Sequence, residues 1–279
     1  MYHMLVTDID GTLLDSEGKV PEETKKILAI LREKRGFITT IATGRMLARA
    51  ESIAREIMIN APLICYNGAL IIDIYTRHRI LERPIPAGKL VELIKLLKEW
   101  GYEVIIYENE TIKVERFNER TRWYINECES IECNAVKDMV DYVKQKDLSS
   151  YKVFAVGDVS KAVEVPAELL SKLEEDFEVS LADQSHMEIN LKGVSKGSAV
   201  KFLADAFKLD STEIITIGDG YNDVSMLKYA GLGIAMGNAA EHIKGYAKYI
   251  TLTNCENGLL NIVNKFIVPQ EKISLEDLR

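Results

Sequence analysis

The sequence predicts an α/β protein with a Rossmann-like core, in which a parallel sheet is interrupted by an inserted α+β domain. Near the N-terminus, short apolar runs typical of strands alternate with amphipathic helical segments, and this alternation resumes after about residue 191. Over about 84–190, helical and strand-like segments follow one another in a different order. Because regular alternation is typical of a parallel sheet with right-handed crossovers, we expect residues 1–83 and 191–279 to form one domain. Residues 84–190 are expected to form a second domain inserted into it.

The first expected strand, at 4–6, runs into two carboxylates. Asp8 and Asp10 are separated by one residue and are followed by Gly11. Side chains two residues apart in an extended strand project to the same side. Both carboxylates should therefore face the space beyond the strand end, where ligands bind in open α/β sheets. A hard cation such as Mg2+ would relieve the repulsion between them, although Asp-Gly is also a common turn pair.

More polar clusters end the next strands of this alternation. A helix is expected from Pro21 to Gly36, and the strand after it stops at Thr43-Gly44-Arg45. The elements expected in this part are strands at 37–42 and 62–66, a helix at 46–58, and a hairpin formed by 70–74 and 79–81. The strand at 62–66 ends at Asn67-Gly68. Because every parallel strand here ends in small or polar residues, we expect a site at this edge of the sheet.

The inserted segment and the return to the first domain have their own elements. In the insertion we expect helices at 87–100, 118–128 and 166–175, and strands at 102–107, 111–114, 152–156 and 187–191. After it, a helix opens at Ser195-Lys196-Gly197, and a short apolar strand at 214–217 runs into Asp219, Asn222 and Asp223. Strands at 233–236 and 249–252 and a final helix after Asn257 complete the first domain.

Composition excludes several classes of protein. The 279 residues are 47% hydrophobic and 28% charged, which is typical of a folded globular protein. A net charge of −8 argues against binding to nucleic acid, since no basic excess is available for phosphates. No apolar run approaches the roughly 20 residues that span a bilayer, and no signal segment precedes the first strand. We therefore expect a cytoplasmic monomer or homodimer that acts away from membranes. The four cysteines lack metal-site spacing and are expected to be free thiols.

Together the polar clusters supply what phosphoryl transfer needs, namely positioning and charge neutralisation. We expect Asp8 to be the nucleophile and Asp10 the general acid and base. Mg2+ would be held by Asp8, the backbone carbonyl of Asp10 and Asp219, with Asp223 as a further member of the metal site. The residues expected around the phosphate are Thr43, Gly44, Arg45, Lys196 and Asn222. Asn222 and Asp223 would also fix the metal ligands and their waters.

Eight stretches carry a resemblance to a known family. They are 8–14, 42–45, 66–69, 193–197, 218–223, 226–227, 235–239 and 256–258. In this order they resemble the haloacid dehalogenase superfamily, specifically its Cof-type phosphatase branch. The insertion falls between Thr43 and Lys196, which is where this branch carries its α/β cap.

The resemblance implies Mg2+-dependent hydrolysis of small phosphate monoesters, such as sugar phosphates or phosphorylated cofactors, through an aspartyl-phosphate. The partner would be a small phosphorylated metabolite, and the cap would recognise its leaving group. One alternative is a phosphotransferase or phosphomutase that passes the phosphoryl group to a second alcohol. Another is a non-catalytic sensor of phosphorylated metabolites, which the presence of Asp8, Asp10, Lys196 and Asp219 disfavours.

Some single residues keep two interpretations. Arg45 binds the phosphate or anchors the helix after it, and Asn67 contacts the phosphate or only forms its turn. Lys196 is either functional or an ordinary first-turn lysine, although a cation there opposes the helix dipole. In the cap, four basic residues either meet an anionic substrate or lie on a solvated face, and we expect the solvated face for each: Arg116, Arg120, Arg122 and Lys152.

Overall fold

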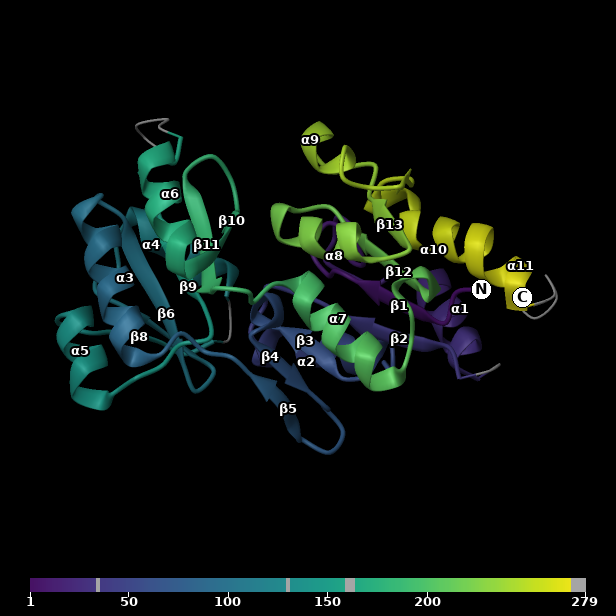
Figure 1. Ribbon diagram of the computed structural model, residues 1–279, viewed down its shortest axis with the longest axis horizontal. Helices are drawn as coiled ribbons and strands as arrows, with labels where there is room; N and C mark the ends of the chain where they lie inside the picture. Colours follow the sequence, from purple (N-terminus) through teal and green to yellow (C-terminus); the bar gives the residue numbers. More distant parts are fainter. Residues whose placement is uncertain (34–35, 129–130, 159–163, 272–279) are drawn as a thin grey trace. The chain divides into compact units, whose positions relative to one another are not determined.

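The computed structural model describes residues 1–33, 36–128, 131–158 and 164–271. The chain divides into two compact units (Figure 1). The first unit comprises Met1–Arg45, Ala50–Ile80 and Ser195–Arg279, and the second comprises Met46–Arg49 and Leu81–Val194. The second unit therefore starts and ends a few residues from the expected 84–190 insertion, and it also takes in a short segment near residue 46.

The first unit is built on a five-stranded parallel sheet. Its strands are β1 (Met4–Thr7), β2 (Ile38–Ile41), β12 (Ile214–Gly218), β13 (Leu232–Ala235) and β14 (Tyr249–Ile250), in the order β14-β13-β12-β1-β2. β1 lies inside the sheet, where Leu5 is paired with Ile215 on one side and with Thr39 on the other. All four residues of β1 are buried, as expected for a parallel strand covered on both faces. The predicted α/β fold with a parallel sheet is confirmed.

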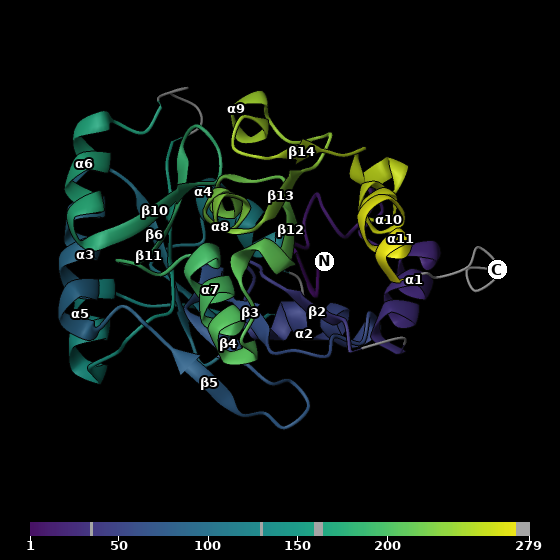
Figure 2. The ribbon, with the colours of Figure 1, turned by 45° about the vertical axis from the view of Figure 1, so that its right-hand side comes forward.

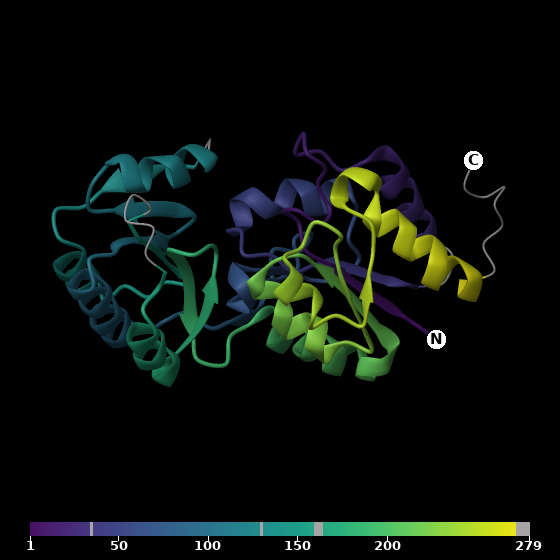
Figure 3. The same cartoon turned by 90° about the horizontal axis from the view of Figure 1, so that it is seen from above.

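Helices cover both faces of this sheet. They are α1 (Glu22–Glu33), α2 (Leu47–Glu56), α7 (Lys196–Phe207), α8 (Val224–Tyr229), α9 (Glu241–Lys244), α10 (Gly258–Ile262), a π-helical turn (Val263–Ile267) and α11 (Val268–Glu271). α7 packs against α8, and α1 packs against α10; Figure 2 shows α10 beside α1. Figure 3, seen from above, shows these two pairs on opposite faces of the sheet. The three-layer arrangement leaves the carboxyl ends of the strands free to carry loops.

A small antiparallel sheet adjoins the parallel one. It consists of β3 (Leu63–Cys65), β4 (Leu70–Ile72) and β5 (Arg79–Glu82), in that order. We expected β3 as a third strand of the parallel sheet, but it belongs to the small antiparallel sheet, and an isolated parallel bridge between Ala42 and Ile64 connects the two sheets. The main partner of β3 is β4, because the chain turns back through Asn67 and Gly68, which both adopt positive φ.

The second unit contains a six-stranded sheet with helices. The strands are β6 (Glu103–Glu108), β7 (Thr111–Val114), β8 (Cys133–Ala135), β9 (Val153–Val156), β10 (Phe177–Leu181) and β11 (His186–Leu191), in the order β10-β11-β9-β6-β7-β8. The helices are α3 (Ala87–Glu99), α4 (Glu119–Glu127), α5 (Met139–Lys146) and α6 (Ala167–Asp176). One core joins α3, α5 and α6 to one face of the sheet. On the other face, Tyr124 of α4 stacks on Phe154. The prediction missed β8, β10 and α5.

One basic residue of this unit is not where we expected it. Lys152 is only 2% exposed and forms an ion pair with Glu188 of β11. The expected solvated face is therefore wrong for Lys152, because its ammonium pairs with Glu188 and lies 5.5 Å from the centre of the Tyr107 ring in β6. Arg116 and Arg122 are exposed as expected, and Arg120 donates to Asp158 over 2.6 Å.

Candidate active site

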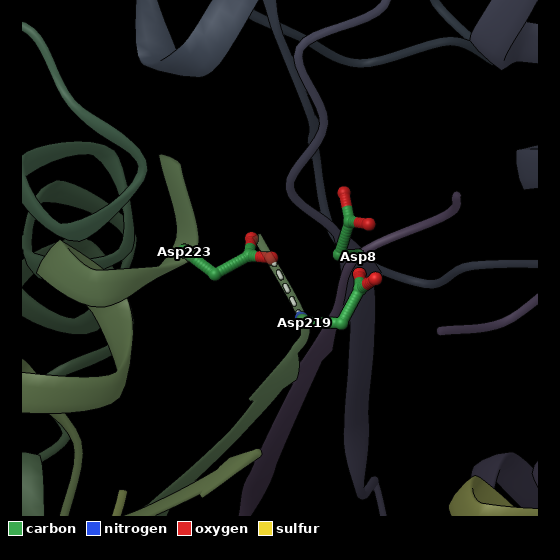
Figure 4. A group of neighbouring side chains, drawn as sticks. All are labelled: Asp8, Asp219 and Asp223. Atoms are coloured by element: carbon green, nitrogen blue, oxygen red, sulfur yellow. Dashed lines mark hydrogen bonds between the residues drawn. The ribbon is translucent and has the colours of Figure 1, made fainter. Parts of the chain in front are cut away.

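The polar clusters predicted from the sequence come together at the carboxyl edge of the parallel sheet. Asp8 follows β1 directly, Asp219 follows β12, and Asp223 lies in the turn just before α8. Figure 4 shows the three carboxylates at one place. One oxygen from each of the three lies within 4.8 Å of the others. The parallel pairing of β1 with β12 causes this juxtaposition, since it sets both strand ends side by side.

Lys196 is the cation at the centre of this group. It is the first residue of α7, is fully buried, and its Nζ donates to Asp8 Oδ1 over 2.7 Å and to Asp223 Oδ1 over 2.6 Å. Burial by itself lowers the pKa of Lys196, but the charges of Asp223 and Asp8 outweigh it and hold the pKa above its usual value. The ammonium is therefore permanently charged at neutral pH.

Lys196 does not neutralise the negative charge of the three carboxylates around it. Burial raises the pKa of Asp8 well above its usual value, and the charges of Asp223 and Asp219 raise it further, while Lys196 opposes the shift. Burial, with the charge of Asp223, also raises the pKa of Asp219 to about 6. Three carboxylates against one ammonium leave an excess of negative charge in a buried place. A second cation would relieve it.

Backbone contacts keep Asp223 in position. Its Oδ2 accepts hydrogen bonds from the backbone N–H groups of Asp219 and Gly220, each over 2.9 Å. A Cβ at position 218 would lie 2.3 Å from Asp223 Cγ, so only glycine lets the carboxylate lie this close to the end of β12. The loop Gly218–Asp223 is thus folded around its own carboxylate.

Two side chains contact the Asp219 carboxylate, one from the loop after β1 and one from the loop after β13. The Thr12 hydroxyl donates to Asp219 Oδ1 over 3.1 Å, and Asn238 Nδ2 lies 3.3 Å from Asp219 Oδ2. Gly11 has a φ of +71°, and a Cβ there would lie 2.2 Å from Asp219 Oδ2. A side chain at position 11 is therefore excluded both by the backbone conformation and by the carboxylate.

Asp10 and Arg45 form a separate ion pair in this structure. Arg45 Nε donates to Asp10 Oδ2 over 2.8 Å, and its Nη2 contacts Asp10 Oδ1. The Asp10 side chain is 61% exposed, so its carboxylate lies outside the buried group formed by Asp8, Asp219 and Asp223. Thr43 is buried, and its hydroxyl accepts from the backbone N–H of Arg45 over 3.1 Å. Gly44, between them, is partly exposed.

Asn222 contacts Asn67, the residue expected either to contact the phosphate or only to form its turn. Its Nδ2 donates to Asn67 Oδ1 over 3.1 Å. Asn67 is buried with a φ of +58°, a conformation that asparagine tolerates better than most residues. The backbone N–H of Asn67 donates to the carbonyl of Thr43 over 2.9 Å. Asn67 therefore connects the loop after β2 to the loop that carries Asp219 and Asp223.

The donor set suits a divalent cation. Asp8, Asp219 and Asp223 offer hard carboxylate oxygens within a short distance of one another, and hard oxygen donors are the ligands that Mg2+ and Ca2+ prefer. Burial and the neighbouring carboxylates raise the pKa values of Asp8 and Asp219, and a bound cation would oppose that shift. A buried carboxylate cluster of this kind fits a divalent metal ion, as the sequence predicted for this edge of the sheet.

A family model of the haloacid dehalogenase-like hydrolases matches residues 5–263, nearly the whole chain. The chain belongs to this family. The predicted superfamily is confirmed, and so is the predicted enzyme class, a phosphoric monoester hydrolase.

Similar proteins cover this hydrolase almost from end to end. A putative phosphatase of Haemophilus influenzae is 27% identical over 95% of this chain and 98% of its own. The 5-amino-6-(5-phospho-D-ribitylamino)uracil phosphatase of Bacillus subtilis is 25% identical over 95% of this chain and 96% of its own. A haloacid dehalogenase-like hydrolase from Bacteroides thetaiotaomicron, known from its crystal structure, has a TM-score of 0.79 and 27% identity. That comparison covers 96% of this chain and all of the crystallised one.

Three contributors to the site were not singled out from the sequence. Thr12, Asn238 and the positioning role of Asn67 emerge only from contacts between loops that are far apart in the chain. Thr12 and Asn238 did fall within stretches that resemble the family, which was the available signal. Within the described parts of the chain, no helix is long and apolar enough to cross a membrane.

Proposed function

We propose that this hydrolase is a Mg2+-dependent phosphatase of small phosphate monoesters that works through an aspartyl-phosphate on Asp8. The observation that carries the proposal is the buried position of Asp8, with Lys196 on one oxygen and Asp219 and Asp223 beside it. The Asp8 carboxylate and the phosphate ester are both anions, so Asp8 can attack phosphorus only if their repulsion is overcome. Lys196 supplies part of the required positive charge.

Mg2+ would be held by Asp8, Asp219 and Asp223 together with the backbone carbonyl of Asp10, and it would neutralise carboxylate and phosphoryl oxygens together. Since Oδ1 of Asp8 accepts from Lys196, we assign the attack on phosphorus to Oδ2. The Oδ2–P bond forms and the bond from phosphorus to the ester oxygen breaks. The Thr43 hydroxyl, Gly44 and Asn222 are proposed to hold the remaining phosphoryl oxygens.

Asp10 is proposed to act as the general acid and then as the general base. In its protonated form it gives a proton to the leaving ester oxygen, and as a carboxylate it then takes a proton from the water that attacks the aspartyl-phosphate. That water forms a new bond to phosphorus, the Oδ2–P bond breaks, and Asp8 and inorganic phosphate are restored. An arriving phosphate dianion competes with Asp10 for the Arg45 guanidinium, which would free Asp10 for this work.

For the domains, we propose that residues 1–83 and 191–279 form the catalytic domain and that residues 84–190 form the cap that recognises the leaving group. The proposed substrates are sugar phosphates or phosphorylated cofactors. The name of the Bacillus subtilis relative, a phosphatase of a phosphorylated ribitylamino-pyrimidine, supports this class.

The test is phosphate release from a broad panel of phosphate esters, with Mg2+ and with a chelator. We expect Asp8→Asn to lower kcat at least about a thousandfold, as for removal of other nucleophiles. Asp15→Asn is the matched control, because Asp15 lies in the same loop and its Oδ1 only accepts turn hydrogen bonds that asparagine preserves. Borohydride reduction of a rapidly quenched reaction, with mass analysis of position 8, tests the aspartyl-phosphate: an acyl phosphate on Asp8 is reduced to homoserine, whereas direct attack of water on the ester leaves Asp8 unchanged.

Two results would overturn the proposal. Metal-dependent turnover that survives in Asp8→Asn excludes Asp8 as nucleophile. A folded, Mg2+-binding protein that hydrolyses no ester, yet passes a phosphoryl group to an added alcohol, would be a phosphotransferase.

A further inference from the structure

Asn238, in the loop after β13, contacts three other loops through one side chain. Its Nδ2 donates to the carbonyl of Gly11 over 2.8 Å and to Asp219 Oδ2 over 3.3 Å. Its Oδ1 accepts from the backbone N–H of Asn254 over 3.1 Å. All the polar atoms of the amide are therefore used, and two of these contacts reach the proposed metal site.

These contacts restrict how the Asp219 carboxylate can turn. Thr12 donates to Oδ1 and Asn238 to Oδ2, so each oxygen has its own donor. The Asp219 carboxylate lies in the space that a Cβ at position 11 would fill. The Gly11 carbonyl and Asp219 Oδ2 share the Asn238 amide, and this ties the loop after β1 to the loop after β12.

The loop that presents Asn238 is itself held by the backbone. The Met236 N–H donates to the carbonyl of Gly218, and the Gly237 N–H donates to that of Leu252, each over 3.0 Å. A Cβ at Gly237 would lie 2.9 Å from the Leu252 carbonyl carbon, so the two loops are in close contact. The amide therefore reaches Asp219 from a fixed support rather than from a free loop.

Packing does not account for asparagine at this position. Asn238 is exposed, and exposed positions usually tolerate substitution within about 0.5 kcal/mol when they make no special contact. The special contact here is to a carboxylate that the proposed function assigns to the metal. Groups that hydrogen-bond to metal-ligating carboxylates fix the orientation of those ligands.

We propose that Asn238 is a positioning residue that orients the Asp219 carboxylate for the divalent cation and joins it to the loop that carries Asp8 and Asp10. This inference rests on the proposed function and deepens it. It assigns to Asn238 a role in metal affinity rather than in contact with the phosphate or the leaving group.

The test is calorimetric titration of Mg2+ into the full-length protein without substrate, for wild type and Asn238→Ala. Loss of a group that orients a metal ligand typically weakens metal affinity 10- to 100-fold, and we expect a change of that size. In the phosphatase assay, the half-saturating Mg2+ concentration should rise by the same factor. At saturating Mg2+, kcat should return to within about threefold of wild type, because the substituted side chain takes no part in the reaction.

Asn254→Ala is the matched control. Asn254 Nδ2 donates to the Leu14 carbonyl over 2.8 Å, so this variant also removes a tether to the loop after β1, but it leaves the contact between Asn238 and Asp219 in place. We expect its Mg2+ affinity to stay within about threefold of wild type, since no metal ligand loses a partner. Melting temperatures of both variants in chelator give the purely structural effect.

The outcomes distinguish a failure of the role of Asn238 from a failure of the proposed function. Equal Mg2+ affinity in wild type and Asn238→Ala, or equal losses in Asn238→Ala and Asn254→Ala, would overturn the role of Asn238 alone. If wild type binds no Mg2+, the metal site of the proposed function fails, and the role of Asn238 fails with it.

Discussion

Replacing Lys196 by methionine measures how much the buried ammonium stabilises the first unit. Methionine keeps an unbranched chain of similar length and removes only the charge and the donors. The wild-type ammonium is fully buried between Asp8 and Asp223. The variant leaves both carboxylates, with Asp219 near them, without the ammonium that pairs with them.

The expected loss of stability follows from the distances between Lys196 Nζ and the carboxylate oxygens of Asp8 and Asp223. At 2.7 and 2.6 Å and an effective dielectric constant of about 20, each pair is worth roughly 6 kcal/mol of Coulomb energy. Much of that offsets the cost of removing three charged groups from water. Removal of one partner of a buried ion pair costs about 3–5 kcal/mol in practice, and we expect Lys196→Met to lower the free energy of unfolding of the first unit by this amount at pH 7.5 in chelator.

The loss of stability caused by Lys196→Met should also depend on pH. Without the ammonium, the carboxylates take up protons more readily, so the loss caused by Lys196→Met should shrink as the pH falls from 7.5 to 5. Added Mg2+ should likewise recover part of the stability, because it replaces the missing positive charge.

The assay must separate the two units. Both tryptophans, Trp100 and Trp123, lie in the second unit, so fluorescence during urea unfolding monitors that unit and serves as an internal control. Hydrogen exchange of the amides in β1 and β12 reports on the first unit. The matched variant is Lys201→Met, on the same helix, where an exposed pair with Asp205 is expected to contribute under about 0.5 kcal/mol.

Two results would refute this reasoning. One is a loss for Lys196→Met no greater than that for Lys201→Met. The other is a loss that stays the same at pH 5 and pH 7.5, since it would then arise from packing and not from charge.

Two further predictions follow from particular side chains. Asp219 has its pKa raised to about 6, so it is mostly ionised at pH 7 and mostly protonated at pH 5; because Mg2+ must displace that proton, we expect about tenfold weaker binding at pH 5. Calorimetry at the two pH values checks this, and equal affinity would contradict it. In the second unit, Lys152→Met leaves Glu188 without its buried cation, and we expect a loss of about 3–5 kcal/mol in urea unfolding followed by tryptophan fluorescence. A loss below about 1 kcal/mol would show that water already stabilises Glu188.

The strand ends were the most predictable part of this molecule. Asp8 and Asp219 each follow a short apolar run, and parallel strands bring such ends to one edge whatever lies between them in the chain. The sequence predicted Lys196 at the start of a helix, and the structure confirms this, because Lys196 is the first residue of α7. These features are local in sequence, and so is their signal.

Contacts between distant loops were not predictable in the same way. The orientation of Asp219 depends on Thr12 and Asn238, and nothing local to either residue indicates that contact. Lys152 lies directly before β9, and its burial depends on the direction that its side chain takes there, which so short an alternation of residues does not decide. In the second unit, β8 has only three residues and none is buried, so it carried no apolar signal.

The place of β12 beside β1 has a consequence for synthesis on the ribosome. Asp8 and Lys196 are 188 positions apart, an interval of about 10–40 s at ordinary rates of translation. The main part of the second unit, Leu81–Val194, is contiguous and is complete before Lys196 emerges. During that interval β1 has β2 as a partner but lacks β12, and the Asp8 carboxylate lacks its ammonium. The second unit can therefore form first, although synthesis of the first unit begins earlier, and β1, the strand made first, acquires its last neighbour near the end.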